Sequence, residues 1–431
     1  MIEDAPIFAL ASAQGRGALA ILRLSGAGMD TIVRALAGKL PPSRQASLLR
    51  LRNQANETLD HALVLWFPAP RSFTGENCAE LHLHGGRAVL QAVTDTLLIL
   101  GARPAQPGEF SRRAFLNGKM DLLEAEAIAD LVAAETESQR RQALRQMQGA
   151  LSHLMQDWAK RLRRILAFQE ALIDFPDEDL PPAVEAELAA ELAALRAAMT
   201  THIHDHHRGE RLREGLMIAV AGAPNVGKSS LVNILAGQDV AIVSPLPGTT
   251  RDTLEVRLDL GGVLATLVDT AGIRDTDDLI ESEGVRRARR RLEDADLVLS
   301  VFDASNPQPE TLATQAPVLI IANKCDLAPA PSDILAVSAL TGAGLDKLRS
   351  TLVEQVRALV EHAGPPPLTR ERHRAALIDT VAALDAALDA PLPELRAEDL
   401  RMALLHLGRI TGHVGVEDLL DTIFGSFCIG K

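Results

Sequence analysis

The segment 222–229 reads Gly-Ala-Pro-Asn-Val-Gly-Lys-Ser and matches the pattern G-x-x-x-x-G-K-[ST]. It follows the apolar run 216–221 and opens a segment of helical periodicity, which is the strand–loop–helix context that this motif needs. The glycines let the backbone aim successive N–H groups at phosphate oxygens, and the helix N-terminus adds partial positive charge. We expect Lys228 to bridge the β- and γ-phosphates and the Ser229 hydroxyl to bind Mg²⁺. The motif therefore predicts a nucleoside triphosphate site in an α/β domain.

The choice of base depends on residues 323–326, Asn-Lys-Cys-Asp, which follow the apolar run 317–322. The Asp326 carboxylate can accept hydrogen bonds from both N1–H and the exocyclic amine of guanine, whereas adenine offers no such donor pair. Ser338 and Ala339 follow another apolar run and are expected to close a loop over the base oxygen. We therefore predict GTP in preference to ATP.

Two further segments are expected to contact the phosphates. Asp269 ends an apolar run and can hold Mg²⁺ through water, while Gly272 can direct its N–H toward the γ-phosphate. In the loop 248–252, Thr250 is expected to complete the Mg²⁺ shell in the triphosphate state. The predicted nucleotide-binding set is Asn225, Val226, Gly227, Lys228, Ser229, Ser230, Ser244, Pro245, Leu246, Pro247, Gly248, Thr249, Thr250, Asp269, Thr270, Ala271, Gly272, Asn323, Lys324, Asp326, Ser338 and Ala339.

The position just after Gly272 is Ile273, where Ras-like enzymes carry the glutamine that orients the attacking water. The following loop, 274–284, contains several carboxylates, but an acidic loop is usually a solvated surface. Spacing alone does not assign a catalytic group, so this question stays open from the residues themselves.

The rest of the chain predicts a multidomain α/β + α protein. Residues 1–118 mix short apolar runs (18–24, 62–67 and 79–83) with turns and a helical stretch near 88–100, which favours an α+β domain. Helical periodicity covers 122–175 as one run, stops at Pro176, resumes at about 183–204 and returns after Glu371. Strands alternate with helices from 216 to about 360, which predicts a mostly parallel sheet with helices on both faces. We expect an N-terminal domain at 1–118, a discontinuous all-α domain at 119–210 and 368–431, and a Ras-like P-loop G domain inserted at 211–362.

Composition excludes several classes of function. The net charge of −13 provides no general field for nucleic acid, so any RNA contact would have to be a local patch. Three widely spaced cysteines form no disulfide framework, and the apolar runs are too short to span a membrane. With no signal peptide visible, we expect a soluble, cytoplasmic chain.

Whole-chain motifs resemble those of the MnmE (TrmE) family of tRNA-modification GTPases. They are GRGALAILRLSG (15–26), RSFTGENCAELHLHGG (71–86), PGEFSRRAFLNGKMDLLEAEAIADL (107–131), IDFPDE (173–178), GTTRDTLE (248–255) and the terminal Phe-Cys-Ile-Gly-Lys (427–431). The terminal Cys-x-Gly-Lys joined to a GTPase is the most specific of these features. The resemblance also implies that the N-terminal domain binds folate and mediates dimerisation.

The resemblance assigns roles residue by residue. Potassium would be bound by Asn225, Ser244, Leu246 and Thr249, with Ser244 standing where the family has threonine. Glu281, twelve residues after Asp269, matches the glutamate that orients water; with Lys228 and Cys428 it makes up the expected catalytic set. A 5-formyl- or 5,10-methylene-tetrahydrofolate would contact Arg23, Glu80, Lys119 and Lys431.

The resemblance also implies partners and a reaction. It implies a homodimer that forms a heterotetramer with an FAD-containing protein of the MnmG (GidA) family. Together they would add an aminomethyl or carboxymethylaminomethyl group at C5 of the wobble uridine, position 34, of certain tRNAs. A ribosome-assembly GTPase and a regulatory GTP switch without a biosynthetic role are the alternatives.

Four histidines lie close together at His202, His204, His206 and His207. Such a cluster can indicate zinc, but no cysteine or obvious carboxylate stands beside it at ligand spacing. We interpret it as a solvated helix end.

Overall fold

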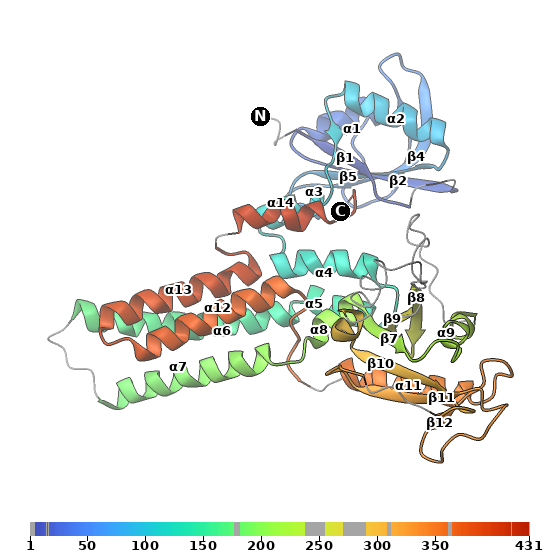
Figure 1. Cartoon of the computed structure of the whole chain (residues 1–431). Coiled ribbons are helices and arrows are strands. Elements are labelled where there is room, and N and C mark those ends of the chain that lie inside the picture. The colour runs from blue at the N-terminus through green and yellow to red at the C-terminus, as the bar shows by residue number, and fades with distance from the viewer. Residues whose placement is uncertain are drawn as a thin grey trace, which may run out of the picture. The chain divides into compact units, whose positions relative to one another are not determined.

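The chain forms two compact units in a computed structural model (Figure 1). One comprises 1–129, 146–188 and 382–431, and the other 130–145 and 189–381. The structure describes residues 5–13, 15, 17–175, 182–237, 255–269, 290–307, 312–360, 364–414 and 416–430, with 182–185 and 417–419 described by backbone alone.

The first unit begins with a six-stranded sheet in the order β3-β4-β5-β2-β1-β6. Its strands are β1 (Ile7–Leu10), β2 (Leu19–Ser25), β3 (Ser47–Arg52), β4 (Thr58–Phe67), β5 (Cys78–His84) and β6 (Arg103–Pro104). Helices α1 (Met29–Ala37) and α2 (Arg87–Ile99) cover one face of this sheet (Figure 1). On α1, the apolar residues recur at the three- and four-residue spacing of a helix, so that one side of the helix is buried in the same core as alternate strand residues.

Helices complete the first unit. They include α3 (Glu109–Leu116), α6 (Ala150–Asp174), α13 (Pro393–Thr411), α14 (Glu417–Gly425) and the start of α4 (Leu122–Ala133). The C-terminal residues pack on the N-terminal part: the Phe424 and Phe115 rings are 6.3 Å apart, and a Cβ on Gly430 would lie 2.6 Å from the carbonyl oxygen of Leu10. The end of the chain is therefore held against strand β1.

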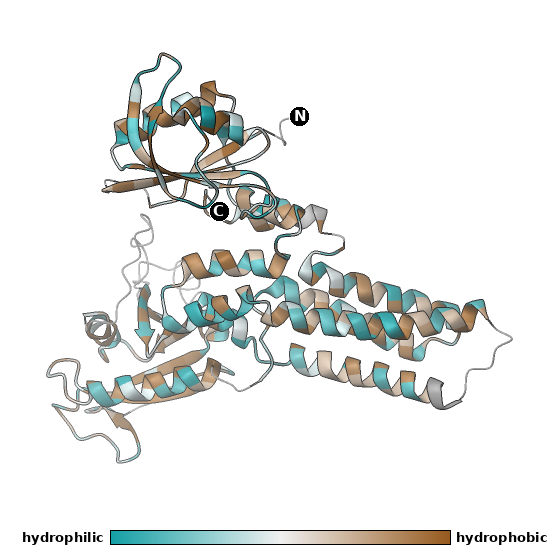
Figure 2. Ribbon diagram, turned by 180° about the vertical axis from the view of Figure 1, so that it is seen from behind, coloured by the Kyte–Doolittle hydropathy of each residue, from teal (hydrophilic) through white to brown (hydrophobic). Residues whose placement is uncertain are grey.

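The second unit holds the other six-stranded sheet, ordered β12-β11-β10-β7-β9-β8. Its strands are β7 (Leu216–Ala221), β8 (Glu255–Leu260), β9 (Val263–Asp269), β10 (Leu297–Asp303), β11 (Val318–Asn323) and β12 (Leu335–Ala336). The pairs are parallel except β8 with β9, and Figure 2 colours much of this sheet hydrophobic. Helices α9 (Lys228–Gly237) and α11 (Leu345–Val360) pack on one face, and helical residues 290–294 with Leu312 and Ala316 pack on the other. The sheet is thus mixed, with helical segments on both faces, as the alternating pattern predicts.

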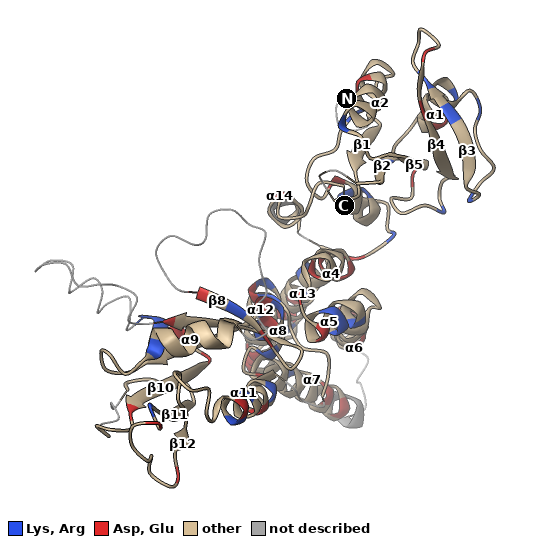
Figure 3. Ribbon diagram, turned by 90° about the vertical axis from the view of Figure 1, so that its right-hand side faces the viewer, with Lys and Arg blue, Asp and Glu red and all other residues tan. Residues whose placement is uncertain are grey.

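Alternation along β7 explains the two layers. Ile218 and Val220 belong to the core under α9 and α11, whereas Ala219 and Ala221 belong to the core on the opposite face. Helix α11 carries both signs of charge (Figure 3), whereas its buried residues are the apolar Leu345, Leu348, Leu352 and Val356. A strand buried on both faces and flanked by amphipathic helices is typical of a parallel sheet.

Further helices lie wholly or partly in the second unit. Helix α5 (Glu137–Met147) is fixed to α8 (Arg208–Glu214) and the residues around it, because the Gln142 amide donates to the Gly209 carbonyl at 2.9 Å and Gln139 donates to the Arg213 carbonyl at 2.9 Å. Helices α7 (Pro182–Ile203) and α12 (Glu371–Asp389) cross the division between the units.

The single helical run expected over 122–175 is wrong, because the structure divides it into α4, α5 and α6. The Gln139 side chain accepts hydrogen bonds from the Glu135 and Thr136 N–H groups and so caps the start of α5. Gly149 has φ 82°, the left-handed conformation, immediately before α6. The sequence patterns also missed β1, β3 and α1. Among the described residues, no helix has the length and apolarity to cross a bilayer.

Candidate nucleotide site

The loop between β7 and α9 has the backbone that the motif requires. Gly222 has φ +142°, and a Cβ there would lie 2.0 Å from the Val301 carbonyl oxygen. Gly227 has φ +95°, and a Cβ there would lie 2.3 Å from the Asn323 amide nitrogen. Both glycines therefore allow close approach to neighbouring strands, which shapes the loop as a cradle at the N-terminus of α9.

Lys228 and Ser229 start α9 and turn back toward the loop. The buried Lys228 ammonium donates to the carbonyl oxygens of Gly222 and Ala223 at 2.6 and 2.8 Å. The Ser229 hydroxyl donates to Asp269 Oδ2 at 2.6 Å, and Asp269 stands at the end of the neighbouring strand β9. The structure thus brings together the three residues that the sequence assigned to phosphate and magnesium.

Asn323 ties the base-recognition strand to the phosphate loop. Its amide nitrogen donates to the Val226 carbonyl at 2.8 Å, and its amide oxygen accepts the Ala339 N–H at 3.0 Å. One buried side chain therefore fixes two loops that the sequence had placed in the same site.

Lys324 makes a second link. It has φ 61°, and its ammonium donates to the Asn225 carbonyl at 2.9 Å and to Asp303 Oδ2 at 2.7 Å. The hydrogen bond from Lys324, together with those from Ser305, lowers the pKa of Asp303 to about 2. Asp303 therefore stays ionised at physiological pH and keeps Lys324 oriented.

Asp303 is not among the residues that the sequence motifs predict. Asp303 is the last residue of β10, and β10 lies parallel to β11 in the sheet. Asp303 is therefore paired with Asn323, the last residue of β11. An acidic residue closing a largely apolar strand was the available signal.

Asp326 lies open to solvent at the carboxyl end of the sheet. The Ser338 hydroxyl donates to its Oδ1 at 2.5 Å, while the Ser338 oxygen also accepts the Thr341 N–H at 3.1 Å. The carboxylate is held by one oxygen and keeps acceptor capacity for a ligand's donors.

Several predicted site residues lie outside the described part of the chain. They are Ser244, Pro245, Leu246, Pro247, Gly248, Thr249, Thr250, Thr270, Ala271, Gly272, Glu281 and Lys431.

In the N-terminal domain, Arg23 and Glu80 face each other across β2 and β5. The guanidinium of Arg23 lies 3.1 Å from the Glu80 carboxylate and 5.2 Å from the centre of the Phe73 ring. Lys119 donates to the Pro70 carbonyl at 3.0 Å. Cys428 is exposed next to the buried Phe427.

Comparison with known proteins gives matches over the whole length of the chain. Family models match the MnmE helical domain at residues 122–428 and the N-terminus of the GTP-binding protein TrmE at 6–119. The tRNA modification GTPase MnmE of Gluconacetobacter diazotrophicus is 57% identical, over 100% of this chain and 99% of its own. That of Granulibacter bethesdensis is 54% identical, over 99% of both chains.

The chain belongs to the MnmE family of tRNA modification GTPases. Among solved structures, the G domain of the T. maritima FeoB iron transporter is 28% identical, covering 32% of this chain and 98% of that one, with a TM-score of 0.26. Membership of the MnmE family makes the chain a GTP hydrolase.

A GTPase of the MnmE family binds Mg²⁺ with its nucleotide. The residues fit this ion, because Ser229 and Asp269 present adjacent oxygen atoms, the donor type that Mg²⁺ prefers. When bound, Mg²⁺ offsets negative charge on the phosphate oxygens. In the described structure, Asp269 holds the Ser229 hydroxyl and so keeps the two oxygens together.

Substituting Gly222→Ala is expected to destabilise this MnmE-family protein by about 3 kcal/mol or more. The added Cβ meets a backbone carbonyl at 2.0 Å and cannot be relieved by a side-chain rotation. Thermal unfolding of the full chain measures the effect. Gly425→Ala is the control, since nothing lies within 4 Å of a Cβ there; equal melting temperatures for the two variants would contradict the tight packing at Gly222.

Proposed function

We propose that this chain is the GTPase of a tRNA wobble-uridine modification system. It works with an FAD-containing partner of the MnmG family to add an aminomethyl-type group at C5 of uridine 34. Tetrahydrofolate supplies the one-carbon unit, and GTP hydrolysis drives a conformational cycle. The observation that carries this proposal is a guanine-nucleotide site on a chain 57% identical, over its full length, to a tRNA modification GTPase.

The domain assignment belongs to the same proposal. The N-terminal domain at 1–118 binds folate and forms a homodimer, the helical domain comprises 119–210 and 368–431, and the G domain is inserted at 211–362. Two such chains and two partner chains form a heterotetramer.

Potassium beside the phosphates takes the place of an arginine finger, and Glu281 orients the attacking water. Asn225 supports this assignment. It has φ 65°, its carbonyl is held by Lys324 at 2.9 Å, and its exposed amide bonds with no described residue. Because the backbone of Asn225 is held in place and its side-chain oxygen is not used in another hydrogen bond with a described residue, this oxygen can bind a monovalent cation.

GTP hydrolysis by the full chain is expected to be at least about 10-fold faster in potassium than in sodium at equal ionic strength. The larger ion matches the oxygen set that Asn225 contributes to, and it offsets charge that develops between the β- and γ-phosphates. Phosphate release assays measure the rates, with Asn225→Ala expected to remove most of the difference. Equal wild-type rates in the two salts would refute the role of potassium.

Two contacts in the N-terminal domain support a folate site. The Arg23 guanidinium is paired with Glu80 and stacked near the Phe73 ring, so cationic, anionic and aromatic groups converge. Folate carries a pterin with an amide-like edge and a glutamate tail, which such groups can bind. Cys428, exposed near the end of the chain, is proposed to face the same substrate.

Mass spectrometry of tRNA nucleosides tests the main proposal. Cells lacking this protein are expected to lose the C5-modified wobble uridine, and a plasmid copy should restore it. The Lys228→Ala copy should fail to restore it. Unchanged wobble uridines in the deletion strain would exclude the proposal.

A ribosome-assembly GTPase is the main rival, but such proteins usually carry a basic RNA-binding module, and this chain has a net charge of −13. A regulatory switch is the second rival. Folate binding by the full chain separates the main proposal from the regulatory switch, because a switch has no use for a one-carbon donor. The main proposal expects folate to bind and expects Glu80→Gln to weaken the binding.

A further inference from the structure

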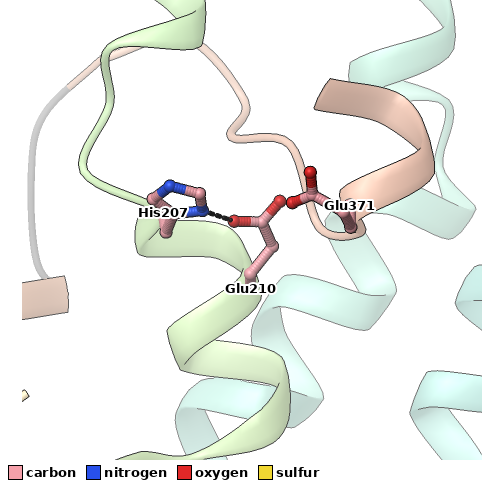
Figure 4. A group of neighbouring side chains, drawn as sticks. All are labelled: His207, Glu210 and Glu371. Atoms are coloured by element: carbon pink, nitrogen blue, oxygen red, sulfur yellow. Dashed lines mark hydrogen bonds and ion pairs between the residues drawn. The ribbon is translucent and has the colours of Figure 1, made fainter. Parts of the chain in front are cut away.

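Outside the nucleotide site, three ligand-type side chains from two helices converge in the second unit. Nδ1 of His207, just before α8, lies 2.5 Å from Oε2 of Glu210. Glu371 is the first residue of α12. One ligand atom from each of these residues, hereafter the His207 cluster, lies within 4.8 Å of the others (Figure 4).

The two carboxylates of the cluster point toward each other, as Figure 4 shows. Glu371 is exposed and has no hydrogen bond or ion pair with any described residue, so solvent-facing rotamers are open to it. Like charges at this separation repel, and a free exposed glutamate would turn away. A cation bound between the two carboxylates would offset this repulsion and keep them close together.

The charges around the cluster leave an excess of negative charge. Arg374 pairs with Glu210 at 3.1 Å and with Asp205 at 2.8 Å. The side chain of Asp205 is only 4% exposed, and its Oδ2 has no hydrogen-bond partner among the described residues. Asp205, Glu210 and Glu371 thus carry three negative charges beside the guanidinium groups of Arg374 and Arg208, which leaves an excess of one negative charge that a cation can offset.

Two arginines of α8 lie nearby. Arg211 pairs with Asp296 at 2.6 Å, and Arg208 donates to the backbone carbonyl of Asp205 at 2.9 Å. Arg374 donates to both oxygens of Glu210, from Nε to Oε1 at 3.2 Å and from Nη2 to Oε2 at 3.1 Å, and a hydrogen bond of this kind orients a carboxylate that binds a metal ion.

We propose that His207, Glu210 and Glu371 form a zinc-binding site. One imidazole and two carboxylates suit Zn²⁺, with water in the remaining position. His207 and Glu371 are exposed, so small rotations of their side chains bring the three donors to one ion. The four-histidine cluster was interpreted as a solvated helix end; His202 is in fact buried, and the companions of His207 come from Glu210 and from Glu371, far along the sequence.

The site has a structural consequence. Helix α8 directly precedes β7, and α12 begins after α11, the last helix on the sheet. The ion therefore links α8, which precedes the first strand of the sheet, to the start of α12, which follows the last helix that packs on the sheet. Because the ion binds only when these segments are folded together, it stabilises the folded chain by mass action.

The test uses the full chain, stripped with a chelator, dialysed against Zn²⁺ and analysed for bound metal. Wild type is expected to hold one more Zn²⁺ per chain than His207→Asn or Glu371→Gln. Asparagine tolerates the left-handed backbone at 207, and glutamine keeps the shape of glutamate, so both variants should fold. The matched controls are His206→Asn, also at positive φ, and Glu394→Gln, in the first turn of α13.

Thermal unfolding provides the second measurement. Zn²⁺ should raise the melting temperature of wild type and of both controls by a few degrees. The increase should be absent from His207→Asn and Glu371→Gln. A wild type without bound Zn²⁺, or either cluster variant retaining the wild-type stoichiometry and melting shift, overturns the proposal.

Discussion

Lys228→Ala is expected to lower the rate of GTP hydrolysis by roughly 10³-fold. Its ammonium is buried in the loop at the N-terminus of α9, where it donates to two loop carbonyls, Gly222 and Ala223. We propose that these contacts hold the charge where the β- and γ-phosphates would bind. The alanine variant leaves the charge that develops on the transferred phosphoryl group without its nearest protein cation. Single-turnover phosphate release measures the loss.

The control for Lys228→Ala is Lys347→Ala, which removes an exposed lysine from the outer face of α11. It should hydrolyse GTP at the wild-type rate. Thermal unfolding of both variants checks that the loss is not a failure to fold. A Lys228→Ala variant that remains folded and keeps even a tenth of wild-type activity would show that this lysine is not the principal phosphate contact.

The approach of Ser229 to Asp269, and of Asn323 to the loop before α9, was predictable from the sequence. Gly222 and Gly227 occupy positions where positive φ and close packing exclude other residues, so the motif itself specifies the backbone. Asp269 and Asn323 each end an apolar strand, and carboxyl ends of parallel strands meet at one edge. Order and spacing along the chain therefore sufficed to bring these residues together.

Other features depended on contacts that no local pattern encodes. The break between α4 and α5 rests on one side chain, Gln139, which caps backbone groups in a run that is otherwise helical in composition. The partner of Lys324 is Asp303; the sequence shows that Asp303 closes an apolar run, but its pairing with Lys324 depends on the strand order of the sheet. Glu371 meets His207 because the chain returns there after completing the sheet. Such pairings are tertiary, and periodicity does not contain them.

In the proposed function, the contacts of Asn323 and Lys324 link the loop that binds the base to the loop that binds the phosphates. Asn323 bonds to the phosphate loop at Val226 and to the base loop at Ala339, while Lys324 bonds to Asn225. Two adjacent residues thus join the two loops. Asp326 takes part in none of these contacts. Replacing it is therefore expected to change the base specificity and to leave the loop before α9 unchanged.

Asp326→Asn is expected to weaken GTP binding by roughly 10³-fold and to favour XTP. The carboxylate accepts from both N1–H and the exocyclic amine of guanine, whereas an asparagine amide offers one acceptor and one donor. Xanthine keeps N1–H and carries a carbonyl oxygen in place of the amine, so its edge matches the amide. Ser338, which donates to Oδ1 of Asp326, can donate equally to the asparagine oxygen and hold the side chain in place. Competition against a fluorescent GTP analogue measures both affinities.

A change from GTP to XTP preference in Asp326→Asn would show that Asp326 recognises the base, whereas loss of both nucleotides would indicate general damage to the site. Asp333→Asn, in the exposed loop before β12, is the matched control and should bind GTP as wild type does. XTP hydrolysis by Asp326→Asn should approach the wild-type rate with GTP, because Lys228, Ser229 and Asp269 keep their contacts. A variant that loses GTP without gaining XTP would mean that Asp326 maintains the loop structure through Ser338 instead of binding the base directly.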